Sequence, residues 1–130
     1  MKNSIYYFLF IGLIFASCLG QNSDKFQSID VKQFSKLINT EQNVQLVDVR
    51  SAAEYADSHI EKSININLNS EGFESNVLKL DKTRPIYVYC QAGGRSKKAA
   101  SKLHDLGFKQ IIELDGGISD WKTNKMATIK

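Results

Sequence analysis

The sequence has few residues of the kinds that hold metals or punctuate a chain: two cysteines, two histidines and one proline among 130 residues. No pair of these cysteines and histidines has metal-ligand spacing, so the sequence predicts no metal site. The formal net charge is only +3 and the lysines are scattered. A nucleic-acid binder is expected to carry a clustered basic stripe with interleaved aromatic residues, and we predict no nucleic-acid partner.

The length allows one domain at most. With 42% hydrophobic and 24% charged residues, the composition is that of an ordinary soluble globular protein once the N-terminus is set aside. The remainder contains no internal repeat and no low-complexity segment.

The N-terminus has the layout of a secretory signal. Lys2 supplies one cation, an apolar run follows from Ile5 to Phe15, and small residues come next. The run has 11 residues, whereas a helix that crosses a bilayer needs roughly 20. A permanent transmembrane anchor is therefore the weaker interpretation.

The "FASC" stretch that ends at Cys18 resembles the lipobox of bacterial lipoproteins. It implies a signal peptide over residues 1–17, lipidation of Cys18, a lipidated polar tether over 18–26 and a folded domain over 27–130. We then expect a protein of the cell envelope, lipid-anchored to a membrane or periplasmic after cleavage. In the alternative, a plain signal peptide is cut nearby and Cys18 is incidental. A lipidated Cys18 would leave Cys90 as the single thiol, which marks Cys90 as a candidate reactive group.

Helical and strand patterns alternate after the N-terminus. The predicted helices span residues 28–38, 52–58, 72–80, 96–106 and 118–122. Ser28 and Ser51 cap the first two of these helices, and Gly107 stops the fourth. The predicted strands are 44–50, 63–68, 85–90 and 110–114. This alternation predicts an α/β fold with a parallel sheet covered on both faces.

Three groups of polar residues lie where predicted strands end: Asp48 with Arg50, Cys90, and Asp115 with Gly116. Ligands of such sheets bind beyond the carboxyl ends of the strands. The pattern therefore predicts one shared site.

"CQAGGRS" connects a strand to a helix and has the features of a reactive-cysteine loop. The helix N-terminus, the loop amides and the Arg95 cation all favour negative charge near Cys90, and glycine permits the backbone angles of an anion cradle. We expect the thiol to be largely ionised near neutral pH, open to water and nucleophilic. The alternative is a small core residue followed by a bare turn. That alternative explains neither Arg95 nor the second glycine.

Over about residues 26–123, the chain resembles a single-domain rhodanese. The resemblance rests on the segments "LVDVRSAAEYADSHIEKSININL", "IYVYCQAGGRS" and "LHDLGFKQIIELDGGISDWK", taken in this order. It implies a three-layer α/β/α fold with a five-stranded, mainly parallel sheet. It also implies that Cys90 accepts a sulfur atom and becomes a persulfide, with no other cofactor.

Loop length separates two related activities. Four residues separate Cys90 from Arg95, whereas related phosphatases and arsenate reductases have five. A shorter loop makes a smaller cup, which suits one sulfur atom better than a tetrahedral phosphate.

The predicted roles follow from the loop and the resemblance. Cys90 is the catalytic nucleophile, and the substrate-binding loop consists of Gln91, Ala92, Gly93, Gly94, Arg95 and Ser96. Asp48, Arg50 and His59 are expected to support the site. We expect Arg50 to pair with Glu54, His59 to have a hydrogen-bonding structural role, and Trp121 to be a packing residue.

The predicted function is transfer of a sulfane sulfur from thiosulfate or a related donor to a thiol or cyanide acceptor. A non-catalytic sulfur-carrier or docking module at the cell envelope is the alternative. A thiol redox protein is a third class, although redox cycling needs a second thiol and the loop has none nearby.

Overall fold

The computed structural model describes residues 24–130. The predicted signal peptide and the Cys18 lipidation site lie outside the described residues. Between residues 24 and 130, no helix has the length and apolar character needed to cross a membrane.

The described chain folds around one five-stranded sheet whose strand order is β1-β5-β4-β2-β3, and every pair of neighbouring strands is parallel. The strands are β1 (Gln27–Ile29), β2 (Gln45–Asp48), β3 (Ile64–Asn65), β4 (Ile86–Tyr89) and β5 (Ile111–Leu114). The three central strands are buried along their whole length. Near-continuous apolar runs such as "IYVY" are what a parallel sheet covered on both faces requires.

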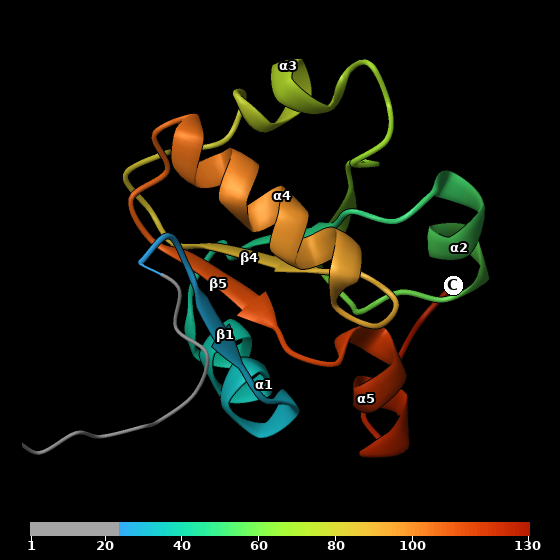
Figure 1. The fold of residues 1–130 in the computed structure, drawn as a ribbon. Coiled ribbons are helices and arrows are strands. Elements are labelled where there is room, and N and C mark those ends of the chain that lie inside the picture. The colour runs from blue at the N-terminus through green and yellow to red at the C-terminus, as the bar shows by residue number, and fades with distance from the viewer. Residues whose placement is uncertain (1–23) are drawn as a thin grey trace, which may run out of the picture.

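Helices cover both faces of the sheet, as Figure 1 shows. They are α1 (Val31–Thr40), α2 (Ala52–Asp57), α3 (Phe73–Val77), α4 (Gly94–Asp105) and α5 (Gly117–Thr123). Side chains of α3 and α4 pack into a core on one face, and those of α1 and α5 pack into a second core on the other. The predicted three-layer α/β/α fold is confirmed.

The N-terminal boundary differs from the sequence prediction. Ser28 does not cap the first helix, because it lies in β1, an edge strand that the periodicity did not reveal. The cap is Asp30, whose carboxylate accepts a hydrogen bond from the backbone N–H of Gln33 over 2.9 Å. A carboxylate at this position satisfies one of the free amides of the first helical turn. Phe26, which we placed in the tether, packs partly buried against the core.

Two helix ends bear directly on the site. Ser51 caps α2 as predicted, in a reciprocal capping box with Glu54. Helix α4 begins at Gly94, two residues earlier than predicted, so Arg95 and Ser96 lie in its first turn. Gly107 follows the end of α4 with a φ of 98°, which confirms its predicted role as the residue that stops the helix.

Candidate active site

The carboxyl ends of β2, β4 and β5 lie at one edge of the sheet because these neighbouring strands are parallel. Arg50, after β2, donates from Nη1 to the side-chain oxygen of Gln91 over 3.3 Å. The backbone amide of Ile118 in α5 donates to the carbonyl oxygen of Cys90 over 2.9 Å. The three strand ends that the sequence singled out are thus brought together.

Cys90 directly follows β4, and its side chain lies beneath the loop. The sulfur accepts the backbone N–H of Gly93 over 3.0 Å and lies 3.4 Å from the hydroxyl oxygen of Ser96, to which the thiol can donate. Cys90 is only 1% exposed and packs in the core beneath α4. The expectation of a thiol open to water is therefore wrong, because the loop folds over the sulfur.

The loop itself lies at the surface. Gln91, Ala92 and Gly94 are exposed, while Gly93 is buried. Gly93 has a φ of 110°, in the left-handed region that favours glycine, and this conformation turns its amide toward the sulfur. The sulfur consequently lies just under the surface, at the N-terminus of the 12-residue helix α4. A helix N-terminus favours negative charge.

Arg95 forms a two-pronged ion pair with Glu54 of α2. Its Nη1 and Nη2 each lie 2.8 Å from a carboxylate oxygen of Glu54. The hydrogen bonds from Arg95 are the main cause that lowers the pKa of Glu54 from 4.5 to about 2. The cation of the loop is therefore already neutralised by a carboxylate from another helix.

The predicted pairing of Arg50 with Glu54 is wrong, because Arg50 pairs with Asp48. Arg50 Nη2 lies 2.7 Å from Asp48 Oδ2, and both residues are buried. Nη2 also donates to the carbonyl oxygen of Ser58 over 2.7 Å. Burial lowers the pKa of Arg50, but the hydrogen bond and charge of Asp48, together with smaller effects of Tyr89 and Glu54, raise it overall. This pair fixes the end of β2 beside Gln91.

Sequence reasoning missed a buried carboxylate behind the loop. Glu113 lies in β5 with no exposed surface, and its Oε1 accepts the hydroxyl of Ser96 over 2.6 Å. Ser28 donates to its other oxygen over 2.5 Å, and Lys97 Nζ lies 3.4 Å away. A single Glu inside the apolar strand "IIEL" is the signal that could have pointed to this residue.

Lys97 links this carboxylate to the surface. Its Nζ also lies 3.1 Å from the exposed carboxylate of Asp115. Burial lowers the pKa of Lys97, but the hydrogen bond to Asp115 and the charges of Glu113 and Asp115 raise it overall. The ammonium group therefore keeps its charge near neutral pH.

Two other singled-out residues have structural contacts. His59 stacks on the ring of Tyr55 at 3.7 Å between centroids, and its Nδ1 lies 2.8 Å from the carbonyl oxygen of Tyr55. Trp121 is buried against Phe34 in the core under α1 and α5. These contacts fit the structural role that we expected for His59 and the packing role that we expected for Trp121.

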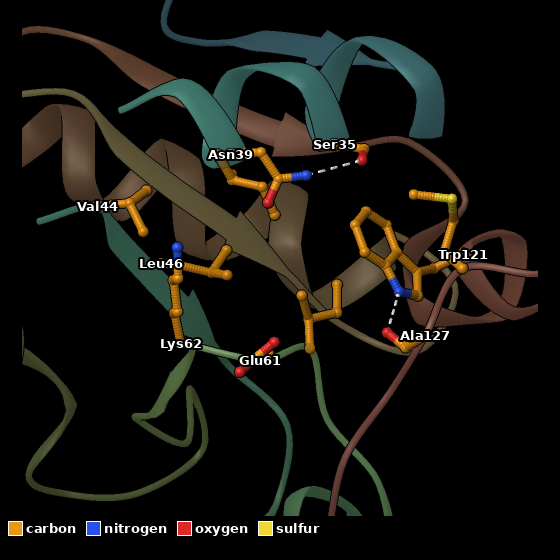
Figure 2. Close-up of a pocket in the computed structure, with 11 residues that line it drawn as sticks. Ser35, Asn39, Val44, Leu46, Glu61, Lys62, Trp121 and Ala127 are labelled. Carbon is orange, nitrogen blue, oxygen red and sulfur yellow. Dashed lines mark hydrogen bonds between the residues drawn. The ribbon is translucent and has the colours of Figure 1, made fainter. Parts of the chain in front are cut away.

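A cavity of about 180 Å³ lies beside Trp121 and Leu46 (Figure 2). Both residues belong to the core on the opposite face of the sheet from Cys90. Trp121 and Leu46 contribute to the cavity wall, and Lys62 and Glu61 lie at its side. Cys90 is not among its lining residues, so this cavity is separate from the loop. Among residues 24–130, no cluster of three or more His, Cys, Asp or Glu side chains is arranged to hold a metal ion.

Comparison with protein-family models matches residues 30–124 to the model of the rhodanese-like domain. The match includes the loop from Cys90 to Ser96, all five helices and four of the five strands.

Individual relatives carry related names. The chain is 33% identical to the thiosulfate sulfurtransferase GlpE of Shewanella oneidensis, over 74% of this chain and 92% of that protein. It is 29% identical to the putative sulfur carrier protein YrkF of Bacillus subtilis, over 78% of this chain but only 54% of that protein. The crystal structure of a rhodanese-related protein from Thermoplasma volcanium superposes with a TM-score of 0.70 at 26% identity, covering 80% of this chain and 98% of that one.

Proposed function

The chain belongs to the rhodanese-like domain family, and from that premise we propose that it is a sulfurtransferase that works through a persulfide on Cys90. The donor is thiosulfate or a related sulfane-sulfur compound, and the acceptor is a thiol, or cyanide in an assay. The similarity to a protein named thiosulfate sulfurtransferase supports this donor class. The loop of four residues between Cys90 and Arg95 supports a cup for one sulfur atom.

One observation carries the proposal: the backbone N–H of Gly93 points at the sulfur of Cys90 from 3.0 Å. A fixed amide donor at a helix N-terminus stabilises negative charge on sulfur without having to reorganise. A cysteine that served only to fill the core would need no such donor, nor a glycine held at a φ of 110° to supply it.

In the first half of the reaction, the Cys90 thiolate attacks the outer sulfur of the donor. A bond forms between Sγ and that sulfur while the sulfur–sulfur bond of thiosulfate breaks. Sulfite leaves with the electron pair of the broken bond. The outer sulfur remains on Cys90 as a persulfide anion, and amides of the loop from Gln91 to Ser96 stabilise its charge.

In the second half, a thiolate or cyanide attacks the outer sulfur of the persulfide. The bond between that sulfur and Sγ breaks, and Cys90 recovers the electron pair as a thiolate. The proposed reaction uses no metal or organic cofactor. The donor and the acceptor both react at the sulfur of Cys90, so the loop must bind them in turn.

Arg95 contributes to donor binding through its charge, and its contact with Glu54 determines how strongly. Because both nitrogens of the guanidinium fork contact Glu54, an anionic donor competes with that carboxylate. Gln91 is held between Arg50 and Ser119, with Nε2 3.3 Å from the Ser119 hydroxyl. These contacts orient the exposed side of the loop, where a donor arrives.

The buried position of Cys90 restricts what reaches the sulfur. Because Cys90 is 1% exposed beneath the loop, we expect only small groups to reach the sulfur without displacing the loop. We expect rapid modification of Cys90 by small thiol reagents and slow modification by bulky aromatic disulfides. Equal rates with both kinds of reagent would show that the loop gives the sulfur no cover.

The direct test is sulfur transfer from thiosulfate to cyanide by the wild type and by Cys90→Ser. The wild type should produce thiocyanate, and its Cys90 peptide should gain the mass of one sulfur after thiosulfate treatment. Cys90→Ser should do neither. A Cys90→Ser protein with full turnover, or a wild type that gains no sulfur from any sulfane donor, would falsify the assignment.

A sulfur-carrier role is the second candidate, favoured by the similarity to a protein named a putative sulfur carrier. A carrier loads sulfur on Cys90 but releases it slowly to small acceptors. Mass spectrometry of the loaded protein, before and after addition of cyanide, separates the two roles. Persistent loading favours the carrier, and rapid unloading favours the enzyme.

We also propose, from the sequence alone, that Cys18 carries a lipid that anchors the protein in the cell envelope. The support is the short apolar run followed by "ASC". Fractionation of cells that express the wild type and Cys18→Ser tests it. The wild type should partition into membranes, and a wild type found only in the soluble fraction would contradict the anchor.

A further inference from the structure

Glu113 is the buried ionisable group that the sulfur-transfer mechanism leaves without a role. It lies in the centre of the sheet with no exposed surface, and both of its oxygens are hydrogen-bonded. Desolvation makes a carboxylate in such a position costly unless it is compensated. Its nearest cation is Lys97, at 3.4 Å.

A continuous chain of polar atoms connects this carboxylate to the sulfur. The thiol of Cys90 donates to Ser96 Oγ over 3.4 Å, and Ser96 Oγ donates to Glu113 Oε1 over 2.6 Å. A hydroxyl can accept one hydrogen bond while it donates another, so Ser96 can receive a proton from one side and release its own to the other.

Two negative charges in one small buried site would oppose each other. Cys90 and Glu113 are 1% and 0% exposed, so a second negative charge beside the first would be costly there. Ionisation of Cys90 without an extra buried charge is possible if its proton stays in the site and neutralises Glu113.

We propose that Glu113 is the proton acceptor for Cys90 and acts through Ser96. The thiol proton moves to Ser96 Oγ, the former hydroxyl proton of Ser96 moves to Glu113 Oε1, and the sulfur keeps the electron pair of its broken S–H bond. Ser96 then donates to the thiolate, beside the amide of Gly93. This inference rests on the proposed function, since it names the positioning groups that ready Cys90 for attack.

The other charged groups around the site form ion pairs. Lys97 contacts Glu113 and Asp115 from α4. Arg95 is paired with Glu54, and Asp48 with Arg50. Glu113 is the carboxylate that a hydrogen-bonded path through Ser96 joins to the sulfur.

A shared proton has a distinctive pH signature. The distribution of one proton between two groups does not depend on pH as long as the site holds only that proton. The rate of Cys90 alkylation by iodoacetamide, followed on the Cys90 peptide of the full chain, should therefore show a plateau in its dependence on pH. At the alkaline end of the plateau the rate should rise.

Glu113→Gln and Ser96→Ala both break the path. In each variant we expect the plateau to be replaced by a rate that increases about tenfold per pH unit, as for a simple thiol. Ser28→Ala is the matched control, because it removes a hydrogen bond from the Glu113 oxygen that does not contact Ser96. This control should keep the plateau. If Glu113→Gln fails to fold, Ser96→Ala still tests the proton path, since the Ser96→Ala variant keeps the Glu113 carboxylate.

Three results would overturn the proposal. The first is a wild-type rate that follows one simple ionisation. The second is a Glu113→Gln protein that reacts faster than wild type throughout, which would mean that the carboxylate only opposes ionisation. The third is a thiol that never reacts. Sulfur loading is measured separately, so a protein that loads sulfur but lacks the plateau refutes the relay alone, and one with the plateau but no loading refutes the sulfurtransferase.

Discussion

The backbone of Gly117 lies directly against the carbonyl oxygens of Cys90 and Gln91. A β-carbon added at Gly117 would come within 2.5 Å of each of these oxygens, and the residue has a φ of 61°. The next two amides, of Ile118 and Ser119, donate to the same two oxygens. The start of α5 is thus the template on which the cysteine loop rests.

Replacement of Gly117 by alanine should displace the loop. The left-handed conformation and the close contact together should cost about 2–4 kcal/mol of unfolding free energy, and sulfur transfer should fall because the Gly93 amide moves with the loop. Urea unfolding and the thiosulfate–cyanide assay measure both effects. Gly94→Ala is the control for stability, since a β-carbon there meets nothing within 4 Å. Equal stability of the two variants would contradict the template role.

The ion pair between Arg95 and Glu54 should govern the affinity for an anionic donor. Arg95→Ala removes the cation and should raise the KM for thiosulfate, whereas Glu54→Gln frees the cation and should lower it. Each change should be about two- to fivefold, as for a partly exposed pair. Steady-state kinetics at low salt measure these values. Shifts of KM in the same direction would mean that the pair matters for loop geometry and not for its charge.

The same ion pair should shape stability in acid. The pKa of Glu54 is about 2 in the folded protein and 4.5 without its partners. The stabilisation is therefore complete above pH 4.5 and is lost as the pH falls toward 2. Urea unfolding of wild type and Arg95→Met across this range should show their difference in stability shrinking as the pH falls. A difference that stays constant would exclude Glu54 as the titrating partner.

The buried pair of Asp48 and Arg50 should be sensitive to loss of one partner. Arg50→Met leaves a carboxylate with no exposed surface and no counter-charge, which should cost about 3–5 kcal/mol. The double variant Asp48→Leu with Arg50→Met should be more stable than Arg50→Met alone. Chemical unfolding of the three proteins gives the comparison. A double variant less stable than the single one would show that Asp48 has further essential contacts.

The central part of the fold could be predicted from the sequence because its signals are local. The apolar runs of β2, β4 and β5 and the helical period of α4 determine what each segment forms, and their alternation determines the parallel sheet. The edge strand β3 lies within the predicted strand 63–68, although it has only two residues. The other edge strand, β1, has three residues and carried too little pattern, so the sequence predicts a helix cap at Ser28 where the structure has a strand.

The cysteine loop was also visible in the sequence, since a strand, a cysteine, two glycines and a helix follow each other without interruption. The hydrogen-bond and ion-pair partners of the loop residues were not visible in the sequence. Arg95 pairs with Glu54, 41 residues away, and Ser96 with Glu113, 17 residues away. Local spacing suggested instead that Arg50 would pair with Glu54, which lies four residues further on.

In the part of the chain that the structure describes, the sequence by itself determined the helices and every strand except β1, and it placed the Cys90 thiol at the amino end of a helix. Only the tertiary structure decided that the thiol is covered, that a buried carboxylate lies two hydrogen bonds behind it, and which acid neutralises which base. The reason is that hydrogen-bond and ion-pair partners are chosen by distance in space. The packing of β5 beside β4, and of α2 beside the start of α4, sets those distances.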